Sequence, residues 1–250
     1  MHVARLGLTP IKGGAHTTHS ELEVDAHGPV GDRVFALIDL GRRRVLRTVE
    51  TSALIRARSR WADGVLTVDL DGEQHRGAPE PRGEPVDVDY WGRTVGVRLQ
   101  SGPWAAAFSR ALGAEVALAR TERRGGFVYG AGVSLITTAE LRTLAERIGA
   151  PVAAERFRCT AVIDTEQEEE AWIGGELQLG SARVRVTAPL IRCAVIDIDP
   201  SGGSERSRLL RELARYRLGP DGIRFGVQAE VIEPGRIRTG DPVQSTMPSS

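Results

Sequence analysis

The sequence PLIRCAVIDIDPSGG, at residues 189–203, is an apolar run with the pattern of a β-strand, and it ends in an Asp-Pro-Ser-Gly turn. It contains Cys193, one of only two cysteines in the chain. If residues 191–198 form a regular strand, side chains alternate and Asp197 lies on the same face as Cys193. Cys193 is then either a small core residue, the commoner case for a lone cysteine, or a thiol that binds something.

Similar short apolar runs recur along the chain and predict a protein built mainly of strands. Several alternate apolar and polar residues, which is typical of half-buried strands, and Gly, Asp and Pro separate them. The predicted strands lie at residues 3–8, 34–39, 53–58, 65–70, 86–90, 94–99, 159–164, 176–179, 182–187, 191–198 and 227–232. The charged segment 73–85, rich in Pro and Gly, is predicted to be a surface loop.

Helical spacing of apolar residues occurs in only three segments, at residues 103–112, 138–148 and 204–217. Gly113 is a suitable C-terminal stop for the first of them. Strands therefore outnumber helices, which predicts a mainly β, α+β fold around a barrel. The polar tail from residue 244 onwards is predicted to be frayed.

The charge balance argues against partners that are polyanions. The chain of 250 residues carries 33 basic and 33 acidic side chains, for a formal net charge of zero. We therefore expect no nucleic-acid partner. No apolar run reaches the ~20 residues that span a bilayer, and the N-terminus lacks the pattern of a signal peptide, so we expect no membrane contact and a cytoplasmic location.

Eight segments, taken in order, resemble the MOSC-domain family, named for the C-terminal domain of molybdenum cofactor sulfurase. They are PIKG (10–13), GDRVFALID (31–39), SLITTAEL (134–141), RFRCTAVID (156–164), WIGGELQL (172–179), RCAVIDIDP (192–200), LLRELARYR (209–217) and FGVQAEVIEPGRIRTGDP (225–242). The family includes mitochondrial amidoxime-reducing components and bacterial hydroxylaminopurine-detoxifying proteins. The resemblance implies a smaller N-terminal β-barrel-like region (residues 1–100), a MOSC β-barrel (101–245) with a few peripheral helices, and a flexible tail (246–250).

The resemblance also implies a cofactor site in a cleft between the two portions. In cofactor-binding relatives, molybdopterin lies there, and the cysteine of an Arg-Cys pair binds molybdenum beside the two dithiolene sulfurs. Cys193 matches that cysteine, and a thiolate is the ligand expected for a thiophilic metal. The residues that match cofactor-contacting positions are Lys12, Gly13, Arg33, Gly130, Ala131, Arg158, Thr160, Arg192 and Gln228. Lys12, Arg33 and Arg158 would supply fixed cations for the cofactor phosphate.

Some positions depart from the family pattern. Arg158-Cys159-Thr160 stands where many relatives have Arg-Pro-Asn, Ile196-Asp197 replaces a Thr-Thr pair, and Gln228 replaces a common tyrosine. Cys159 is either a second thiol in the cleft or a core residue. Because Arg192 precedes Cys193, its side chain would point to the other face of a regular strand, toward the pterin or the backbone.

Other candidate residues add less. His16 and His19 lie three residues apart but lack further metal ligands, and Arg47 matches a basic residue of another family motif. Lys12 is the only lysine, so a pyridoxal Schiff base could form only there, and the resemblance assigns this lysine to the molybdenum cofactor instead.

The sequence leaves three functions open. The first is a molybdenum-dependent oxidoreductase that reduces small N-hydroxylated substrates with electrons from a separate electron-transfer protein. The second is sulfur transfer through a Cys193 persulfide, supplied by a cysteine desulfurase, with no bound cofactor. The departures from the family pattern favour this second reading modestly. The third is a non-catalytic cofactor-binding module.

Overall fold

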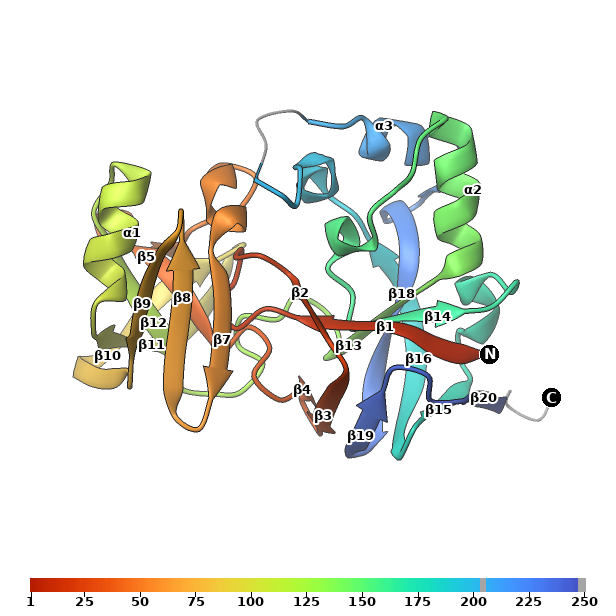
Figure 1. The fold of residues 1–250 in the computed structure, drawn as a ribbon, viewed down its shortest axis with the longest axis horizontal. Coiled ribbons are helices and arrows are strands. Elements are labelled where there is room, and N and C mark those ends of the chain that lie inside the picture. The colour runs from red at the N-terminus through yellow and green to blue at the C-terminus, as the bar shows by residue number, and fades with distance from the viewer. Residues whose placement is uncertain (203–205, 247–250) are drawn as a thin grey trace.

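The computed structural model describes residues 1–202 and 206–246, which form two bodies placed side by side (Figure 1). The first body is built around a closed barrel. Its strands are β5 (Phe35–Asp39), β6 (Arg44–Val45), β10 (Glu80–Tyr90), β11 (Arg93–Ser101) and β12 (Val116–Thr121). A three-stranded sheet of β7 (Arg58–Ala62), β8 (Val65–Leu70) and β9 (Glu73–Gly77) and helix α1 (Trp104–Leu112) share a hydrophobic core with the barrel.

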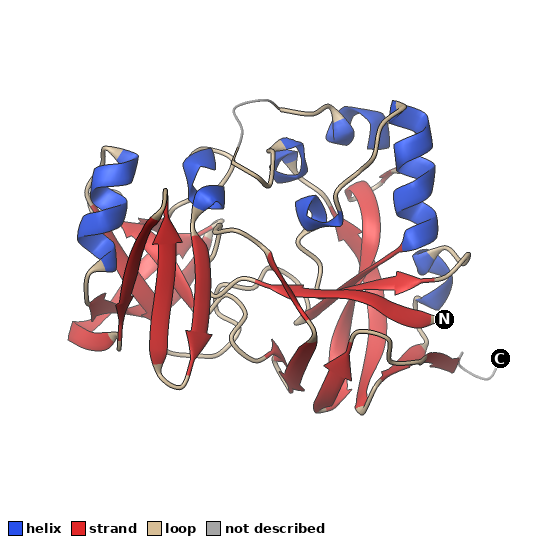
Figure 2. Cartoon of the chain, viewed as in Figure 1, coloured by secondary structure: helices blue, strands red, loops and turns tan. Residues whose placement is uncertain are grey.

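The second body contains a nine-stranded sheet with the order β2-β1-β14-β13-β18-β16-β15-β20, in which β17 also pairs with β18. Its strands are β1 (His2–Leu8), β2 (Thr17–His19), β13 (Val133–Thr137), β14 (Ala161–Asp164), β15 (Glu176–Leu179), β16 (Ala182–Ile191), β17 (Leu218–Gly219), β18 (Gly222–Glu233) and β20 (Val243–Thr246). A small sheet of β3 (Glu21–Asp25), β4 (Gly28–Pro29) and β19 (Gly235–Arg238) packs into the same core. Strands are the main regular structure in both bodies, as Figure 2 shows.

Helices of the second body cover one side of its sheet. They are α2 (Thr138–Ile148) and α3 (Leu209–Leu213), with the 3-10 turns η2 (Ala154–Phe157), η3 (Glu169–Trp172) and η4 (Ala194–Asp197). Leu144, Leu209 and Leu213 of these helices pack with Phe157 and Phe225 in a separate core cluster. No helix in the described parts of the chain is long and apolar enough to cross a membrane.

The chain passes between the two bodies twice. Strand β1 lies in the second body between β2 and β14, and its Val3, Leu6 and Leu8 are buried in that body's core. After β2, β3 and β4, which also belong to the second body, the chain crosses to β5 and returns only after β12. Helix α1 and β12 therefore belong to the first body, although they follow residue 101, the predicted start of the second domain.

The mainly β, α+β class predicted from the sequence is confirmed, and so are two of the three helices. Helix α1 ends at Gly113, which adopts φ 63° as its C-cap, and α2 has the predicted bounds 138–148. Thr137 caps the N-terminus of α2 by accepting a hydrogen bond from the backbone N–H of Glu140 at 3.2 Å. The closed barrel lies in the first body, and the paired strands of the second body form an open path.

Other predicted elements are wrong. Residues 53–58 are mostly the 3-10 turn η1 (Ser52–Arg56), where the consecutive Leu54 and Ile55 are both buried. The segment 73–85 is not a loop, because β9 and β10 pair through their backbones while most of their side chains stay exposed. The third helix is shortened to α3, and residues 204 and 205 of its predicted range lie outside the described residues.

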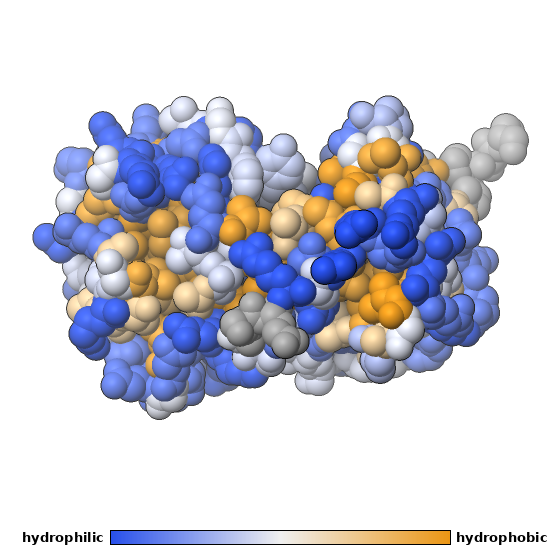
Figure 3. Space-filling model, turned by 90° about the horizontal axis from the view of Figure 1, so that it is seen from above, coloured by the Kyte–Doolittle hydropathy of each residue, from blue (hydrophilic) through white to orange (hydrophobic). Residues whose placement is uncertain are grey.

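The predicted ends of the last strands also shift. The predicted strand 191–198 stops at Ile191, where β16 ends and the turn η4 follows. Residues 244–246 of the predicted frayed tail belong to β20, which pairs with β15. Residues 247–250 lie outside the described part of the chain. Seen from above, the surface is indented where the two bodies meet (Figure 3).

Candidate functional site

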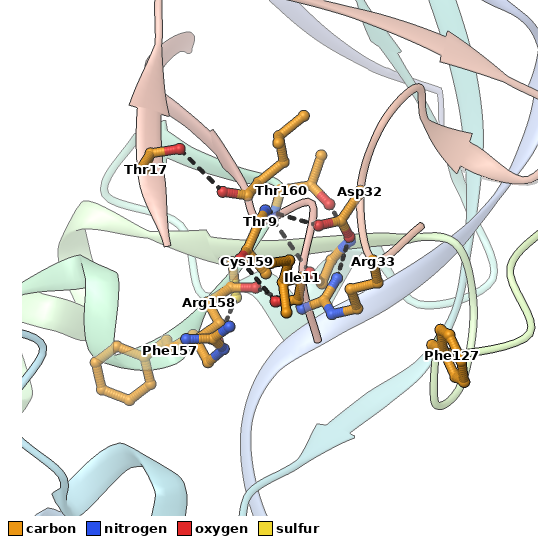
Figure 4. Close-up of polar contacts among 12 residues, drawn as sticks. Thr9, Ile11, Thr17, Asp32, Arg33, Phe127, Phe157, Arg158, Cys159 and Thr160 are labelled. Atoms are coloured by element: carbon orange, nitrogen blue, oxygen red, sulfur yellow. Dashed lines mark hydrogen bonds and ion pairs between the residues drawn. The ribbon is translucent and has the colours of Figure 1, made fainter. Parts of the chain in front are cut away.

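The candidate site lies at the junction of the two bodies and is built from loops rather than strand interiors. The loop between β1 and β2 contributes Lys12, and the segment between β4 and β5 contributes Asp32 and Arg33. The second body contributes Arg158, which follows η2, and Cys193, which follows β16. Because each loop is fixed at both ends by a strand or turn, residues far apart in sequence are held close together (Figure 4).

Cys193 is not a core residue. It is exposed and occupies the N-cap position of η4, with extended backbone angles of φ −127° and ψ 175°. It lies close enough to Lys12 and Arg158 for a thiolate there to raise the pKa of each. The thiol therefore lies near the cations of Lys12 and Arg158.

The regular strand on which we based the position of Asp197 does not exist. Asp197 lies in η4, and its Oδ1 accepts a hydrogen bond from the backbone N–H of Leu210 at 3.0 Å. The carboxylate is thus engaged with the start of α3. The expectation that Asp197 shares a strand face with Cys193 is wrong.

Arg33 has a strained backbone conformation that its hydrogen bonds and its ion pair hold in place. Its φ of 47° is in the left-handed region, and its backbone N–H donates to the carbonyl of Thr9 at 2.7 Å. Its guanidinium forms an ion pair with Asp32, whose Oδ1 in turn accepts from the N–H of Thr9 at 2.9 Å. Its Nη2 also donates to the carbonyl of Arg158 at 3.3 Å, so the two arginines are adjacent (Figure 4).

Arg158 carries the clearest indication of an anion-binding role. It too has a left-handed φ, of 54°, at the end of η2. Both terminal nitrogens, Nη1 and Nη2, are buried and have no hydrogen-bond partner among the described residues. Burial, and secondly the charge of Arg33, lower the pKa of this guanidinium to about 10. A buried cation without partners is costly, so an anion at this point would be strongly favoured.

Lys12 completes the cationic group. Its backbone N–H donates to the carbonyl of Phe35 at 2.7 Å, and the next residue, Gly13, has φ 89°. Burial above all, then the charges of Arg33 and Arg158, lower the pKa of the Lys12 ammonium to about 7. Within the described residues no carboxylate forms an ion pair with it, and its Nζ lies 5.7 Å from the centre of the Tyr90 ring.

Gly13 is required at its position for a steric reason as well. A Cβ there would lie 2.8 Å from Oγ1 of Thr48 and 3.1 Å from Cδ1 of Leu54. Three cations, those of Lys12, Arg33 and Arg158, are thus gathered around one carboxylate, that of Asp32. We refer to these four residues as the cation cluster.

Three residues that were predicted to contact the cofactor lie together but contact one another. They are Gly130, Ala131 and Gln228. Oε1 of Gln228 accepts the backbone N–H of Ala131 at 3.0 Å. Gly130 has φ 90°, and a Cβ on it would lie 2.2 Å from the same oxygen. The donor that the resemblance assigns to the cofactor is therefore already paired with a side chain of this chain.

Thr160 holds the backbone around the site in place. It is 3% exposed, its Oγ1 accepts from the backbone N–H of Ser134 at 3.2 Å, and its own N–H donates to Ser134 Oγ at 3.1 Å. Its carbonyl accepts from the N–H of Gly7 at 3.0 Å. Thr160 thereby ties the loop that carries Arg158 to both β1 and β13.

Arg192 is turned into the core of the second body. Its Nε donates to the carbonyl of Phe225 at 2.6 Å and its Nη1 to that of Phe157 at 2.8 Å, while Nη2 lies 3.1 Å from Sγ of Cys159. Of the two alternatives for Arg192, the backbone contact is the one that the structure has. Cys159 is 1% exposed, which agrees with a core residue and not with a second thiol in the cleft.

Asp32 and Tyr90 were not singled out from the sequence, and His16 was considered there only as a metal ligand. Tyr90 is buried beside Lys12 and donates its hydroxyl to the carbonyl of Phe127 at 3.0 Å. His16 is buried near Arg158, and burial first, then that charge, hold its pKa well below the usual value. Asp32 could have been noticed as the acidic neighbour of Arg33 in the sequence GDR, but no pattern indicated Tyr90.

Within the described residues, the histidine pair and Arg47 show no features of a ligand-binding site. No group of three or more metal-ligating side chains occurs in the described parts of the chain, so nothing extends His16 and His19 into a metal site. Arg47 is paired with Glu50 and Asp89, at 3.4 and 3.3 Å, and its guanidinium lies 4.3 Å from the centre of the Trp91 ring. Its charge is thereby already compensated.

Comparison with known proteins agrees with this architecture. Residues 122–244 match the model of the MOSC domain family. The match begins directly after β12, where the chain enters the second body for the second time. The chain is a MOSC-domain protein.

The relatives of known name match only part of the chain. Mitochondrial amidoxime reducing component 2 from Homo sapiens is 32% identical over 120 residues, which cover 44% of this chain and 35% of that protein. The same protein from Macaca fascicularis gives the same identity and coverage. The match thus spans about a third of the length of these curated relatives. The crystal structure of the YUAD protein from Bacillus subtilis covers 97% of this chain and 93% of its own, with a TM-score of 0.50 and 14% identity, and shares the fold.

Proposed function

We propose that this protein binds molybdenum cofactor at the junction of its two bodies and reduces N-hydroxylated small molecules, with Cys193 as the protein ligand of the metal. The observation that carries the proposal is a pair of buried nitrogens on Arg158 that have no partner in the described part of the chain, in the same site as an exposed thiol. Such a guanidinium fits the phosphate of an anionic cofactor, and the thiol fits a soft metal.

The other residues of the site fit the same group. Lys12 and Arg33 would bind the phosphate together with Arg158, and the tight turn at Gly13 brings the backbone and the Lys12 ammonium to it. Two guanidinium groups and one ammonium, against the single carboxylate of Asp32, suit a dianion. Arg192 has a different role in this proposal, because its hydrogen bonds fix the backbone that precedes Cys193.

Gln228 would have to release or share the N–H of Ala131 for the cofactor to use this donor. This exchange is feasible because an amide side chain has two donors and an acceptor and can bond to a ligand in its new position. The cofactor, when bound, supplies the two-electron reduction of an N–O bond. The chain itself supplies the thiolate, the anchoring cations and the shape of the site.

The electrons would come from a separate electron-transfer protein. The substrate class is taken from the amidoxime reducing components that match part of the chain, and it is a proposal for this protein. A thiol as exposed as that of Cys193 is also open to a cysteine desulfurase, so sulfur transfer is the second candidate function.

Metal and pterin analysis tests the proposal without an activity assay. The chain is produced in cells that make the cofactor, and molybdenum and oxidised pterin are measured per chain in the wild type, Cys193→Ser and Cys159→Ala. We expect Cys193→Ser to lower the molybdenum content at least about tenfold, because serine is a poor ligand for a soft metal. Cys159→Ala, which removes the other thiol, is the matched control and should retain the metal.

The absence of both molybdenum and pterin from the wild-type chain would refute the proposal. In that case, incubation with a cysteine desulfurase and cysteine decides the second function. An added sulfur on Cys193, detected by intact mass, would support sulfur transfer.

A further inference from the structure

Lys12 has surroundings that an ordinary lysine does not have. It is the only lysine among the 250 residues of the chain. Its ammonium is surrounded by Arg33, Arg158 and the Tyr90 ring, and the nearby groups of opposite charge are Asp32 and a Cys193 thiolate. Asp32 is already paired with Arg33, so in the described structure no carboxylate forms an ion pair with Lys12.

The groups beside Lys12 are suited to a phosphate. Among the described residues, Nη1 and Nη2 of Arg158 are buried without partners, and Nη2 of Arg33 bonds only to the carbonyl of Arg158, at 3.3 Å. Planar guanidinium groups bind phosphate with two parallel hydrogen bonds. A phosphorylated compound held here would have the rest of its structure next to an amine that forms no ion pair with a carboxylate of the described residues.

We propose that Lys12 is a carbonyl-reactive amine that forms a reversible imine with phosphorylated aldehydes, which Arg158 and Arg33 bind through the phosphate. This is a ligand and modification site, and it does not rest on the proposed molybdenum function. It lies where the molybdenum proposal places the cofactor phosphate, so the two ligands exclude each other.

The reaction balances without a redox partner. The lone pair of Lys12 Nζ attacks the aldehyde carbon, the amine loses its two protons, and the carbonyl oxygen leaves as water. The product is a C=N bond that water can hydrolyse again. Borohydride, added as the reductant in the assay, delivers hydride to the imine carbon and makes the link permanent.

The protonation state of Lys12 favours this reaction near neutral pH. Burial, with Arg33 and Arg158, lowers the pKa of Lys12 from 10.5 to about 7, whereas Cys193 and Asp32 act in the opposite direction. The neutral, nucleophilic amine is therefore abundant at pH 7 and becomes dominant above it. The yield of trapped imine should rise between about pH 6 and pH 8 and not near pH 10.

The test uses pyridoxal 5′-phosphate as the phosphorylated aldehyde and pyridoxal, which lacks the phosphate, as its matched control. The full chain without cofactor is incubated with each at pH 7.5, reduced with borohydride and mapped by mass spectrometry. We expect one adduct, on Lys12, formed at least about tenfold faster with the phosphorylated aldehyde. The α-amine of Met1 is the internal reference, and Lys12→Arg should abolish the adduct.

Competition gives a readout that does not depend on a variant's folding. Inorganic phosphate should slow modification of Lys12 in the wild-type chain and leave modification of Met1 unchanged. Equal modification of Lys12 and Met1, equal rates with the two aldehydes, or no effect of phosphate would each overturn the proposal. A chain that loads molybdenum but has an unreactive Lys12 in its cofactor-free form would refute this inference alone and leave the proposed function standing.

Discussion

At the scale of single residues, Arg158 should lower the stability of the chain but strengthen its binding of phosphate. Replacing it with alanine removes a buried charge whose terminal nitrogens have no partner in the described structure. Alanine adds no backbone strain that arginine does not already have at φ 54°. We therefore expect Arg158→Ala to leave the free energy of unfolding unchanged or higher, and to weaken phosphate binding by about ten- to a hundredfold.

Denaturant unfolding and phosphate titration by calorimetry measure the two quantities separately. Arg110→Ala, on an exposed position of α1, is the matched control and should change neither. If Arg158→Ala strongly destabilised the chain and left phosphate binding intact, Arg158 would be a structural residue and the assignment would be wrong.

The sequence allowed Lys12, Arg33, Arg158 and Cys193 to be assigned to one site through their resemblance to a family. The structure places these four near one another. It could not be predicted from the sequence that Arg192 turns inward, because this depends on where β16 ends. The pairing of Gln228 with Ala131 was equally hidden, since it joins residues 97 positions apart.

At the scale of elements, the turn at Gly13 positions Lys12. Gly13→Ala would place a Cβ in the left-handed region and also 2.8 Å from Thr48 Oγ1. Gly64 has φ 73°, and a Cβ added there would have no neighbour within 4 Å, so Gly64→Ala shows the cost of the backbone angle alone. We expect about 1–2 kcal/mol of destabilisation for Gly64→Ala and a larger loss for Gly13→Ala.

Thermal or denaturant unfolding gives both values, and the reactivity of Lys12 toward an aldehyde reports on the site. Only Gly13→Ala should alter this reactivity. Equal destabilisation by the two substitutions, with unchanged reactivity, would mean that the turn does not set the position of Lys12.

A buried carboxylate connects three elements behind the site and should make stability depend on pH. Glu169 of η3 accepts hydrogen bonds from the N–H of Gly226 at 2.7 Å and from Thr137 Oγ1 at 2.9 Å. Burial first, then the charge of Glu140, raise the pKa of Glu169 from 4.5 to about 7. The folded chain therefore holds this proton more tightly than the unfolded chain does.

The contribution of Glu169 to the free energy of unfolding is largest below about pH 4.5, falls as the pH rises toward 7, and then levels off. Glu169→Gln keeps both acceptor and donor functions at the carboxamide but cannot ionise. Melting temperatures measured from pH 5 to pH 8 should therefore decline less in Glu169→Gln than in the wild type. Parallel declines in the two chains would contradict this explanation.

Helices proved easier to predict than strands, for physical reasons. The amphipathic spacing and cap residues of α2 are local, so its bounds 138–148 were predicted from the sequence alone. In β9 and the first half of β10, pairing depends on backbone bonds to distant strands while the side chains stay in solvent. Their Pro and Gly residues consequently indicated a loop.

At the scale of the whole molecule, the two bodies are interlaced and not simply joined. Residues 122–246 lack β1, which fills the sheet position between β2 and β14. We expect the fragment 122–246 to lack stable tertiary structure, because Val3, Leu6 and Leu8 leave its core and an edge of β14 becomes unpaired.

Near-ultraviolet circular dichroism of the fragment measures this loss, and a circular permutant that links residue 246 to residue 1 is the control. The permutant retains β1 and should fold like the parent chain. A well-folded fragment 122–246 would show that β1 contributes little. Such long-range pairing is the part of the architecture that local sequence patterns could not indicate.

We propose that Cys193 binds the metal of a cofactor held by the cation cluster. X-ray absorption at the molybdenum edge, recorded on the cofactor-loaded wild-type chain, measures the ligands of the metal. We expect three sulfur neighbours, two from the dithiolene and one from Cys193. Only two sulfur neighbours in the loaded wild-type chain would contradict it.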